Sequence, residues 1–282
     1  KKNNIDFVHT NDARMHLTWI IPAKLNGSKL FWHQRTLYGR SIISNILIHL
    51  SYKVIAISNA VSKSLYEISN VKNFVIYDPV TINKHEFINK NKRKELTKSH
   101  KGKVIILGFF GNLRKIKKPI TFLETAIKLQ KIINGNVLAV VFGEDRENYK
   151  IQMQEVAKKN NFNKKLIFMG FKYPIEEWMS SCDILIAPSS WEAFGRTIVE
   201  AMLLKIPVIA SQSAGHSEIV IDNENGFLAP IDDSDKMANI AKNLLTKKDN
   251  TSAIVKKAEK WAITKFSAKQ HVESVVNLYF YK

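Results

Sequence analysis

From residue 103 onward, short apolar runs alternate with segments of helical periodicity, and this alternation constrains the fold more than any other feature. The apolar runs occupy residues 104–110, 137–142, 165–169, 184–187 and 208–210. Between the first two runs, one face of a helix is marked by Ile116, Ile120, Leu123 and Ile127. Strands that are apolar on both faces and alternate with helices form a parallel sheet covered on both sides. The sequence therefore predicts a doubly wound, nucleotide-binding type of domain, whose ligands bind beyond the carboxyl ends of the strands.

The first 80 residues contain further strand candidates, at residues 5–9, 29–33, 54–58 and 74–77. A second domain of this kind usually needs about 150 residues, so we expect the chain to begin inside a domain. The predicted fold class is α/β, with two Rossmann-like domains of which the C-terminal one is complete and the N-terminal one partial. We assign residues 1–95 to the N-terminal domain with a basic linker and residues 96–250 to the nucleotide-binding domain. Residues 251–282 are predicted to be C-terminal helices that pack back on the N-terminal domain.

The chain carries a net charge of +18, from 43 basic and 25 acidic residues. Its densest basic segment spans residues 84–103, which we interpret first as a solvated linker between domains. Contact with an anionic membrane surface is the second interpretation. Nucleic acid ranks last and is not expected as a partner, because no basic strand interleaved with aromatic residues accompanies the charge. The one cysteine, Cys182, excludes an internal disulfide and is interpreted as a core residue.

The segment SSWEAFGRTIVE, at residues 189–200, is the most specific in the chain. It follows a predicted strand, turns at Gly195, and begins a helix at Arg196. The N-terminus of a helix presents backbone N–H groups and the positive end of a dipole, which suits a diphosphate. Glu192 and Glu200 flank this start, and a carboxylate can accept several hydrogen bonds from sugar hydroxyls. Spacing alone favours the alternative interpretation, in which one glutamate lies on the surface, the other lies on a helix face, and the two have no joint role.

The same segment resembles the signature of glycosyltransferase family 4, in which two glutamates are separated by seven residues and a Phe-Gly pair follows the first. Flanking segments match in the same order, namely APSS, EAM, IPVIA, EIV and NGFL. The resemblance implies the two-domain GT-B architecture, with a donor site in the C-terminal domain and the acceptor on the N-terminal side. It implies that Glu200 binds the ribose hydroxyls of the nucleotide. It also implies that Glu192, with the backbone of Phe194 and Gly195, holds the transferred sugar.

The resemblance further implies that the diphosphate meets the helix that begins at Arg196, at the backbone N–H groups of Thr197 and Ile198. Leaving-group stabilisation of this kind is often the largest catalytic contribution.

A second match is GFFGNLRKIKKP, at residues 108–119. In the family, a glycine is followed by an arginine and, some five residues later, by a lysine, and both cations neutralise the leaving diphosphate. Gly111 and Lys117 occupy the glycine and lysine positions, but Asn112 stands where the arginine is expected. Arg114 lies two residues further on and is predicted to take that role, with Lys115 or Lys118 as alternatives. A solvated basic loop before a helix is the structural alternative.

Two weaker matches complete the donor half. The segment beginning at Gly170 resembles the loop that cups the nucleobase, which places Phe171 there. Gly215 to Glu218 stands where the family has Gly-Gly-x-Pro-Glu, although Ala214 and Ser217 depart from that pattern. Glu218 is interpreted equally well as a capping residue.

In the first part, DFVHTN at residues 6–11 resembles a family strand that ends in His-x-His near the reacting sugar. Asn11 replaces the second histidine, and His9 is either catalytic or an ordinary residue at a strand end. His33 and Arg35 follow the next strand and are expected to face the same cleft. Ser58 most plausibly caps the helix that follows it.

No cofactor and no metal site are expected. Asp233 and Asp235 form an Asp-x-Asp pattern that precedes a predicted helix, so we interpret it as a cap. No His/Cys cluster has the spacing of a zinc site, and neither a complete Gly-x-Gly-x-x-Gly nor a phosphate loop is present. Basic side chains and a helix dipole would then supply the positive charge that a divalent metal supplies elsewhere.

The predicted function is transfer of a hexose-like unit from a nucleoside diphosphate sugar, UDP- or GDP-linked, to an acceptor hydroxyl. Retention of configuration is implied by the resemblance alone. The expected acceptor is a glycan or a lipid-linked sugar in lipopolysaccharide, capsule or other surface glycan synthesis, and the expected location is the cytoplasm, at the inner face of the membrane. Two rivals remain: a nucleotide-sugar epimerase or phosphorolytic enzyme of the same architecture, and a non-catalytic nucleotide-sugar-binding remnant.

Overall fold

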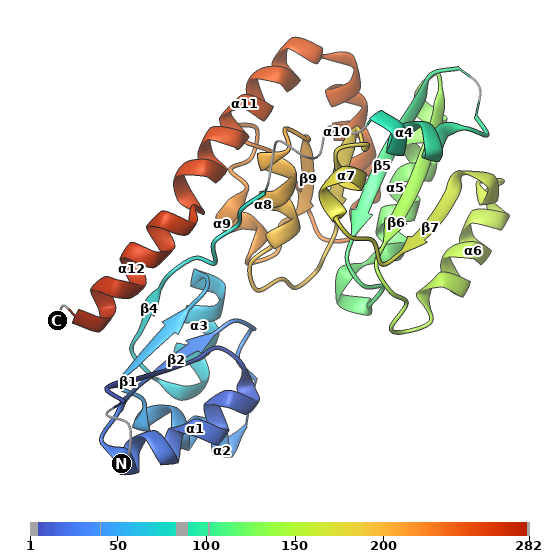
Figure 1. The fold of residues 1–282 in the computed structure, drawn as a ribbon. Helices are drawn as coiled ribbons and strands as arrows, with labels where there is room; N and C mark the ends of the chain where they lie inside the picture. Colours follow the sequence, from blue (N-terminus) through green and yellow to red (C-terminus); the bar gives the residue numbers. More distant parts are fainter. Residues whose placement is uncertain (1–4, 40, 83–89, 101, 281–282) are drawn as a thin grey trace. The chain divides into compact units, whose positions relative to one another are not determined.

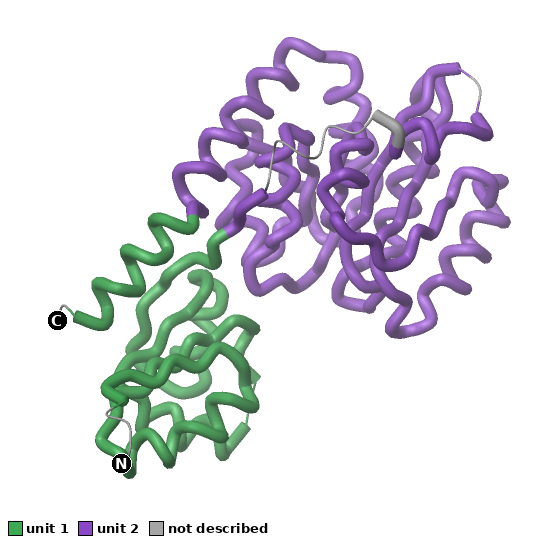
Figure 2. The backbone as a smooth tube through the Cα atoms, in the orientation of Figure 1, with its two compact units in different colours: residues 1–79, 268–282 green, residues 80–267 purple. Residues whose placement is uncertain are grey.

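The computed structural model describes residues 5–39, 41–82, 90–100 and 102–280. The chain divides into two compact units (Figures 1 and 2). The first comprises residues 1–79 and 268–282, and the second comprises residues 80–267. Each unit is built on its own parallel sheet, so the predicted α/β fold with two Rossmann-like halves is confirmed.

The second unit contains a parallel six-stranded sheet in the order β10-β9-β8-β5-β6-β7. Its strands are β5 (Val104–Phe110), β6 (Asn136–Phe142), β7 (Leu166–Gly170), β8 (Ile184–Ala187), β9 (Val208–Ser211) and β10 (Phe227–Ala229). The first five coincide with the apolar runs of the sequence. The sixth is short and has a polar flank, which explains why periodicity does not reveal it.

Helices connect these strands and cover the sheet (Figure 1). They are α4 (Lys90–Thr97), η2 (Lys115–Lys117), α5 (Pro119–Ile132), α6 (Tyr149–Lys159), η3 (Asn163–Lys165), α7 (Ile175–Met179), α8 (Arg196–Leu203), α9 (His216–Ile219), α10 (Ser234–Thr246) and α11 (Lys248–Lys265). Of the residues predicted to mark one helix face, Ile120, Leu123 and Ile127 lie on α5, and Leu123 and Ile127 are buried. The prediction was wrong for Ile116, which lies in η2 and is exposed.

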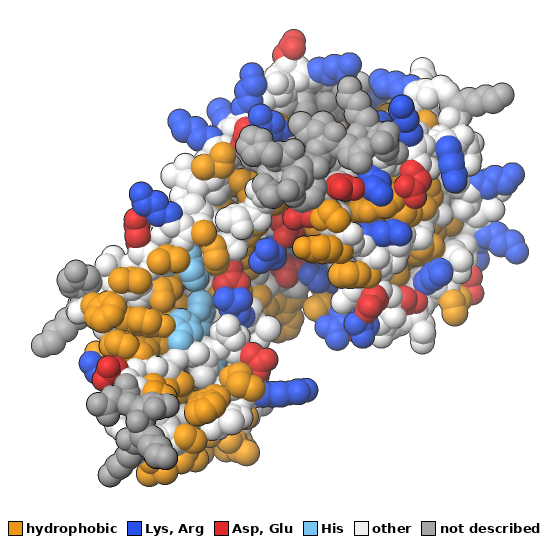
Figure 3. Space-filling view, viewed as in Figure 1, with side chains coloured by type: hydrophobic (Ala, Val, Ile, Leu, Met, Phe, Trp, Pro, Cys, Tyr) orange, Lys and Arg blue, Asp and Glu red, His pale blue; other side chains and the backbone are white. Residues whose placement is uncertain are grey.

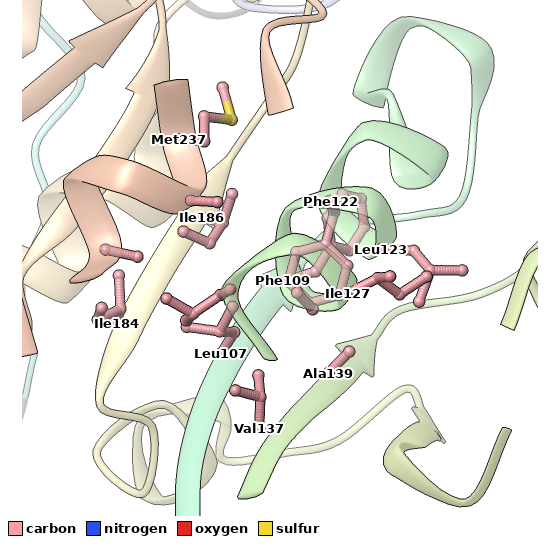
Figure 4. Packing of buried hydrophobic residues seen from close by; sticks show 14 of the residues in the cluster. Leu107, Phe109, Phe122, Leu123, Ile127, Val137, Ala139, Ile184, Ile186 and Met237 are labelled. Carbon is pink, nitrogen blue, oxygen red and sulfur yellow. The ribbon is translucent and has the colours of Figure 1, made fainter. Parts of the chain in front are cut away.

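The core of the second unit lies between the sheet and the helices on one of its faces (Figure 4). Phe109 on β5 packs against Phe122 on α5, with ring centroids 5.4 Å apart. Ile184 and Ile186 of β8 and Met237 of α10 belong to the same cluster. Burying large apolar side chains of this kind contributes roughly 1.5–3 kcal/mol each, so this core holds the loops at the strand ends on a rigid base.

The strand order reverses between β5 and β8, because β6 and β7 lie on one side of β5 while β8, β9 and β10 lie on the other. The connections after these two central strands leave in opposite directions, and a crevice opens at the carboxyl end of the sheet. Residues 111–118 follow β5 and residues 188–195 follow β8. The two segments singled out by the sequence therefore meet at the position where doubly wound sheets bind ligands.

The first unit is a smaller parallel sheet of order β1-β2-β3-β4. Its elements are β1 (Phe7–Thr10), α1 (Ala13–Asn26), β2 (Lys29–Gln34), α2 (Ile42–Leu47), η1 (Ile48–Leu50), β3 (Lys53–Ala56), α3 (Asn59–Ser69), β4 (Asn73–Val75) and α12 (Ala268–Phe280). Ser58 caps α3 as predicted, since its side chain accepts a hydrogen bond from Val61 N at 3.1 Å.

The C-terminal segment is shared between the units. Helix α12 packs on the first sheet, where Tyr279 stacks on Phe7 with ring centroids 5.2 Å apart. Helix α11 packs on α8 and α10 of the second unit instead. The sequence-based division had grouped residues 251–282 together and had placed its other boundary at residues 95/96. The acceptor-side and donor-side roles of the two units stay predictions.

The basic segment 84–103 is only partly a linker. Residues 83–89 and 101 lie outside the described residues, but α4 (Lys90–Thr97) is a helix docked on the second unit. Arg93 donates hydrogen bonds to the carbonyls of Ser181 and Val104 at 2.8 and 2.9 Å and pairs with Asp183. Lys92 lies over the Trp178 ring, 4.5 Å from its centroid. These cations hold the helix in place, so interpretation of the whole segment as a solvated linker was wrong for its second half.

Candidate active site

The carboxyl ends of β5, β6 and β7 are joined backbone to backbone. Gly111 N donates to Phe142 O and Gly143 N donates to Gly170 O, each at 2.9 Å. Gly143 has a φ of +129°, and a Cβ built on it would lie 2.2 Å from Gly111 O. A glycine is required there because any side chain would collide with the neighbouring backbone. The close approach forms the floor of a crevice above the sheet.

The loop after β5 is fastened to the loop after β6. Asn112 Oδ1 accepts from Glu144 N at 3.0 Å, and Glu147 accepts from Lys115 N at 2.7 Å. Arg114 pairs with Glu147 at 3.7 Å and is more than half exposed. Asn112, at the position where the family has an arginine, thus joins the two loops by a hydrogen bond. Arg114 is held by an acidic partner in this structure.

Lys117 is the basic residue of this loop that points across the crevice. Its Nζ forms a short ion pair with Glu192 Oε2. The loops that carry the two residues are tied together as well, since Ser190 N donates to Ile116 O at 2.8 Å. Lys117 and Glu192 are about one quarter and one fifth exposed, so both can be reached from the crevice. Residues from two distant segments of the sequence are therefore brought into direct contact at the switch point.

Helix α8 begins at the rim of this site, as the sequence predicts. Gly195 is its N-cap residue, with a φ of +112° that favours glycine. Ile198 N donates to Gly195 O at 2.9 Å, so this amide is used within the first turn. Thr197 borders the pocket, whereas the side chains of Phe194 and Ile198 are buried in the core. Of the two amides predicted to meet a diphosphate, the amide of Ile198 has an internal partner here.

Glu200 lies one turn into α8 and is held by Arg196, whose Nε donates to Oε1 at 2.8 Å. The Glu200 side chain is only 12% exposed, and that of Arg196 is 62% exposed. Burial raises the pKa of Glu200, and the hydrogen bond from Arg196 opposes this effect. A buried carboxylate with one anchored oxygen is suited to accept hydroxyl hydrogen bonds with its other oxygen.

A pocket of about 330 Å³ opens above these residues. It is lined by Phe110, Gly111, Asn112, Phe142, Gly143, Phe171, Lys172, Tyr173, Ile175, Thr197 and Glu200. The rings of Phe110 and Phe142 are stacked in its wall, 4.6 Å apart and nearly parallel. Phe171 and Tyr173 are largely exposed at its border. A flat aromatic group with a polyhydroxyl unit attached would satisfy both the apolar wall and Glu200.

Several residues of this site escaped the reasoning from sequence. Tyr173 and Lys172 follow Phe171 in the matched loop, so the resemblance could have found them. His216 carries no such signal: it occupies the variable position of the weak match at residues 215–218. Its side chain is 2% exposed and lies 4.0 Å from Glu192. Burial lowers the pKa of His216 to about 4, and the charge of Lys117 acts in the same direction.

The first unit gathers the other predicted residues on its own sheet. His9 Nε2 lies 3.1 Å from His33 Nδ1, and His9 Nδ1 contacts the hydroxyl of Tyr279 on α12. Histidine and apolar side chains are adjacent on the face of this unit drawn in Figure 3. Burial, followed by the charge of His9, lowers the pKa of His33 to about 3. Arg35 pairs with Asp78 at 3.5 Å. A place for His9 beside a reacting sugar stays a prediction.

The structure also shows the surroundings of Asp233 and Cys182, two other residues interpreted from the sequence. Asp233 is the N-cap of α10 and accepts from Lys236 N at 2.8 Å, so its interpretation as a cap is confirmed. Cys182 is buried, and burial raises the pKa of its thiol. Among the residues that the structure describes, no group of three or more His, Cys, Asp or Glu side chains is arranged to hold a metal ion. Within the same ranges, no helix has the length and hydropathy needed to cross a bilayer.

With this geometry established, comparison with known proteins identifies the family. The sequence model of the family described as glycosyl transferases group 1 matches residues 89–261, which include both segments of the site. The chain belongs to this family. The match covers the loop of Lys117, the turn of Glu192 and helix α8, so the resemblance inferred from the motifs is confirmed at the level of group 1.

Curated relatives align with this chain over different lengths. A glycosyltransferase named EpsD from Bacillus subtilis is 32% identical over 169 residues, which is 60% of this chain and 42% of that protein. An Escherichia coli enzyme named UDP-Gal:α-D-GlcNAc-diphosphoundecaprenol α-1,3-galactosyltransferase is 27% identical over 92% of this chain and 75% of its own length. The chain thus spans less than half of the first of these relatives and three quarters of the second.

Solved structures share the fold of this group 1 chain. The crystal structure of HepE from Anabaena in complex with UDP and glucose has a TM-score of 0.87 at 21% identity, covering 97% of this chain and 77% of that one. The C-terminal domain of a group 1 protein, LpcC from Francisella tularensis, has a TM-score of 0.58 at 28% identity. It covers 67% of this chain and all of that domain.

Proposed function

We propose that the chain transfers a sugar from a nucleoside diphosphate sugar to an acceptor hydroxyl, with retention at the anomeric carbon. The observation that carries the proposal is the convergence of Lys117, Glu192 and Glu200 at the switch point of the second sheet, beside a pocket of about 330 Å³. In this proposal, Glu200 binds the ribose and the aromatic border at Phe171 and Tyr173 takes the base. Membership of the group 1 family supports this assignment.

The proposed chemistry is departure of the diphosphate, assisted by positive charge. As the glycosidic bond breaks, negative charge grows on the leaving phosphate, and a preorganised cation at that position lowers the barrier. Lys117 is the side chain that can meet this charge, together with the dipole at the start of α8. Arg114 can contribute only after it leaves Glu147, since the two side chains are paired here. The reaction proposed therefore relies on basic side chains and a helix dipole in place of a metal.

We propose a glycan or lipid-linked acceptor. The E. coli relative is named for a diphosphoundecaprenol-linked acceptor, and further relatives in Rhizobium are named as lipopolysaccharide core mannosyltransferases. The net charge of +18 would favour contact with an anionic membrane surface, where such acceptors reside. Location in the cytoplasm, at the inner face of the membrane, is part of the same proposal.

One observation favours a second candidate, a nucleotide-sugar-binding protein without turnover. Asn112 stands at the position of a family arginine, and its side chain bonds to Glu144 N. The nearest arginine, Arg114, is paired with Glu147. If no cation replaces that arginine, donor binding would persist while departure of the diphosphate would be slow.

Two linked measurements test these candidates. Thermal-shift measurements with UDP-, GDP- and ADP-sugars should identify a donor that raises the melting temperature, because a ligand that binds the folded state stabilises it. Transfer of label from that donor to lipid-linked acceptors, with NMR of the product anomer, should then show transfer with retention. Failure of every donor to bind would refute the site. Binding without transfer to any acceptor would favour the second candidate, and an altered donor in the absence of acceptor would indicate an epimerase.

A further inference from the structure

A buried histidine lies under the turn that carries Glu192. His216 is the first residue of α9, and its Nε2 lies 4.0 Å from Glu192 Oε2. The same carboxylate oxygen is the one that Lys117 binds. A single oxygen of Glu192 therefore faces the Lys117 ammonium group on one side and the His216 ring on the other.

The support beneath this turn is tightly built. Gly215 N donates to Glu192 O at 3.1 Å, and a Cβ built on Gly215 would lie 2.6 Å from the same carbonyl. A Cβ on Gly195 would lie 3.1 Å from the His216 ring. The ring is buried, and the backbone on either side of it approaches closely enough that only glycine fits at residues 195 and 215. The surrounding fold therefore keeps the ring packed beneath the turn of Glu192.

Hydrogen bonding assigns the tautomer of the neutral ring. His216 Nδ1 lies 3.4 Å from Ser211 Oγ. Ser211 donates its single hydroxyl proton to Ser189 O, so toward the ring it can only accept. The ring proton is accordingly on Nδ1, and Nε2 presents a lone pair toward Glu192. Two acceptors facing each other make no bond. With a proton on Nε2, a shift of the Glu192 side chain from 4.0 Å to hydrogen-bond distance would join the two groups.

The charges around the ring determine whether that proton binds. Glu192 faces the ring from the turn before α8, Lys117 from η2, and Ser211 from the end of β9; Glu218 follows on the same short helix. Burial lowers the pKa of His216, Lys117 lowers it further, and Glu192 raises it. With Lys117 on Glu192, the carboxylate is neutralised and the ring stays uncharged.

We propose that His216 is a positioning residue. When Lys117 turns to the diphosphate of the donor, His216 binds a proton from solvent on Nε2 and replaces Lys117 as the partner of the Glu192 carboxylate. The inference rests on the proposed function. The ion pair between Lys117 and Glu192 opens, a proton adds to the Nε2 lone pair, and the new N–H donates to Glu192. Two opposite charges about 4 Å apart, at an effective dielectric constant near 20, change an acid dissociation constant about a thousand-fold. Departure of Lys117 removes one of the two influences that lower the pKa of the ring, and the attraction of Glu192 then favours the charged ring, which holds Glu192 against the sugar.

Isothermal titration calorimetry measures how many protons the protein takes up when it binds a donor. UDP-glucose and GDP-mannose are titrated into the protein at pH 6.5 in buffers of different ionisation enthalpy, because their diphosphate diesters do not titrate near this pH. Wild-type protein should take up roughly half a proton or more per donor bound. His216→Gln should bind donor with uptake near zero. The exposed His49, changed to Gln as a matched control, should leave the uptake at the wild-type value.

The outcomes separate this inference from the function on which it rests. If neither these two donors nor any other UDP-, GDP- or ADP-sugar binds, the proposed function and the inference fail together. Binding without proton uptake, or with equal uptake in His216→Gln, overturns the inference alone. Should His216→Gln fail to fold, NMR of the wild-type protein labelled with ¹⁵N-histidine decides: one buried histidine must change from neutral ring to imidazolium on donor binding, and an unchanged neutral signal refutes the idea.

Discussion

Replacement of Glu200 by glutamine tests the nucleotide site with the smallest change in shape. Glu200 Oε1 is held by Arg196 at 2.8 Å, and among the described residues Oε2 has no hydrogen-bond partner. In the proposed complex the free oxygen accepts from ribose hydroxyls. The substitution keeps one oxygen acceptor but removes the charge that strengthens these bonds.

The expected loss of affinity follows from the number of bonds affected. A hydrogen bond to a charged group contributes about 1.5–3 kcal/mol, so a loss of about 2–3 kcal/mol corresponds to a dissociation constant about 30- to 150-fold higher. At a donor concentration 100 times the wild-type constant, the wild-type protein gains about 2.7 kcal/mol of stability. Glu200→Gln should gain less than about 1 kcal/mol at that concentration.

Without ligand, the same substitution should leave the stability of the protein unchanged or raise it. Burial raises the folded-state pKa of Glu200 above its unfolded value, so the folded chain binds its proton more tightly than the unfolded chain. Ionisation therefore costs stability as pH rises from the unfolded pKa through the raised folded one. Because Glu200→Gln removes this cost, the variant without ligand should melt at the wild-type temperature or above it once the pH exceeds this range.

Differential scanning fluorimetry and calorimetry with the identified donor give both quantities. Glu155→Gln is the matched control, because Glu155 is an exposed residue on α6 of the same unit. A dissociation constant for Glu200→Gln within about threefold of wild type, with an intact fold, would refute the assignment of Glu200 to the nucleotide.

Three further predictions concern separate parts of the molecule. Lys117→Ala should lower kcat about 100- to 1,000-fold in the transfer assay, because loss of one preorganised charge has an effect of this size. The control Lys115→Ala, on the exposed side of η2, should keep a kcat near that of the wild type. Equal kcat values for the two variants would exclude Lys117 from catalysis. Arg93→Ala should lower the free energy of unfolding of the second unit by about 1–3 kcal/mol in urea, because two backbone carbonyls and the Asp183 carboxylate each lose the hydrogen bond from Arg93. An effect no larger than that of exposed Lys94→Ala would show that α4 is not docked in solution. Burial lowers the folded-state pKa of His33 to about 3, so the free energy of unfolding of the first unit should fall by up to about 1.4 kcal/mol per pH unit as pH falls below the unfolded pKa near 6.5. Tryptophan fluorescence should show this acid transition in the wild type and a flatter one in His33→Leu. Identical profiles for the two proteins would contradict the prediction.

Much of the second unit follows from local sequence. Five of its six strands coincide with apolar runs, and the start of α8 at Arg196 follows from the turn at Gly195. Helix α4 was missed because its charged residues lack a periodic apolar face; it is anchored through Arg93 to carbonyls distant in the chain. Strand β10 was missed because three residues are too few to show a period.

The sequence by itself determined the fold class, most of the strands and helices along the second unit and the two segments that carry the site, because apolar periodicity, glycine turns and helix starts are local properties. Only the tertiary structure decided which side chains meet. It paired Lys117 with Glu192 across 75 residues and placed His216 beneath them. It also bound Asn112 and Arg114 to the neighbouring loop, where sequence position had suggested a role at the phosphate. The physical reason is that the strand order reverses beside β5, and this topology brings distant loops to one edge of the sheet.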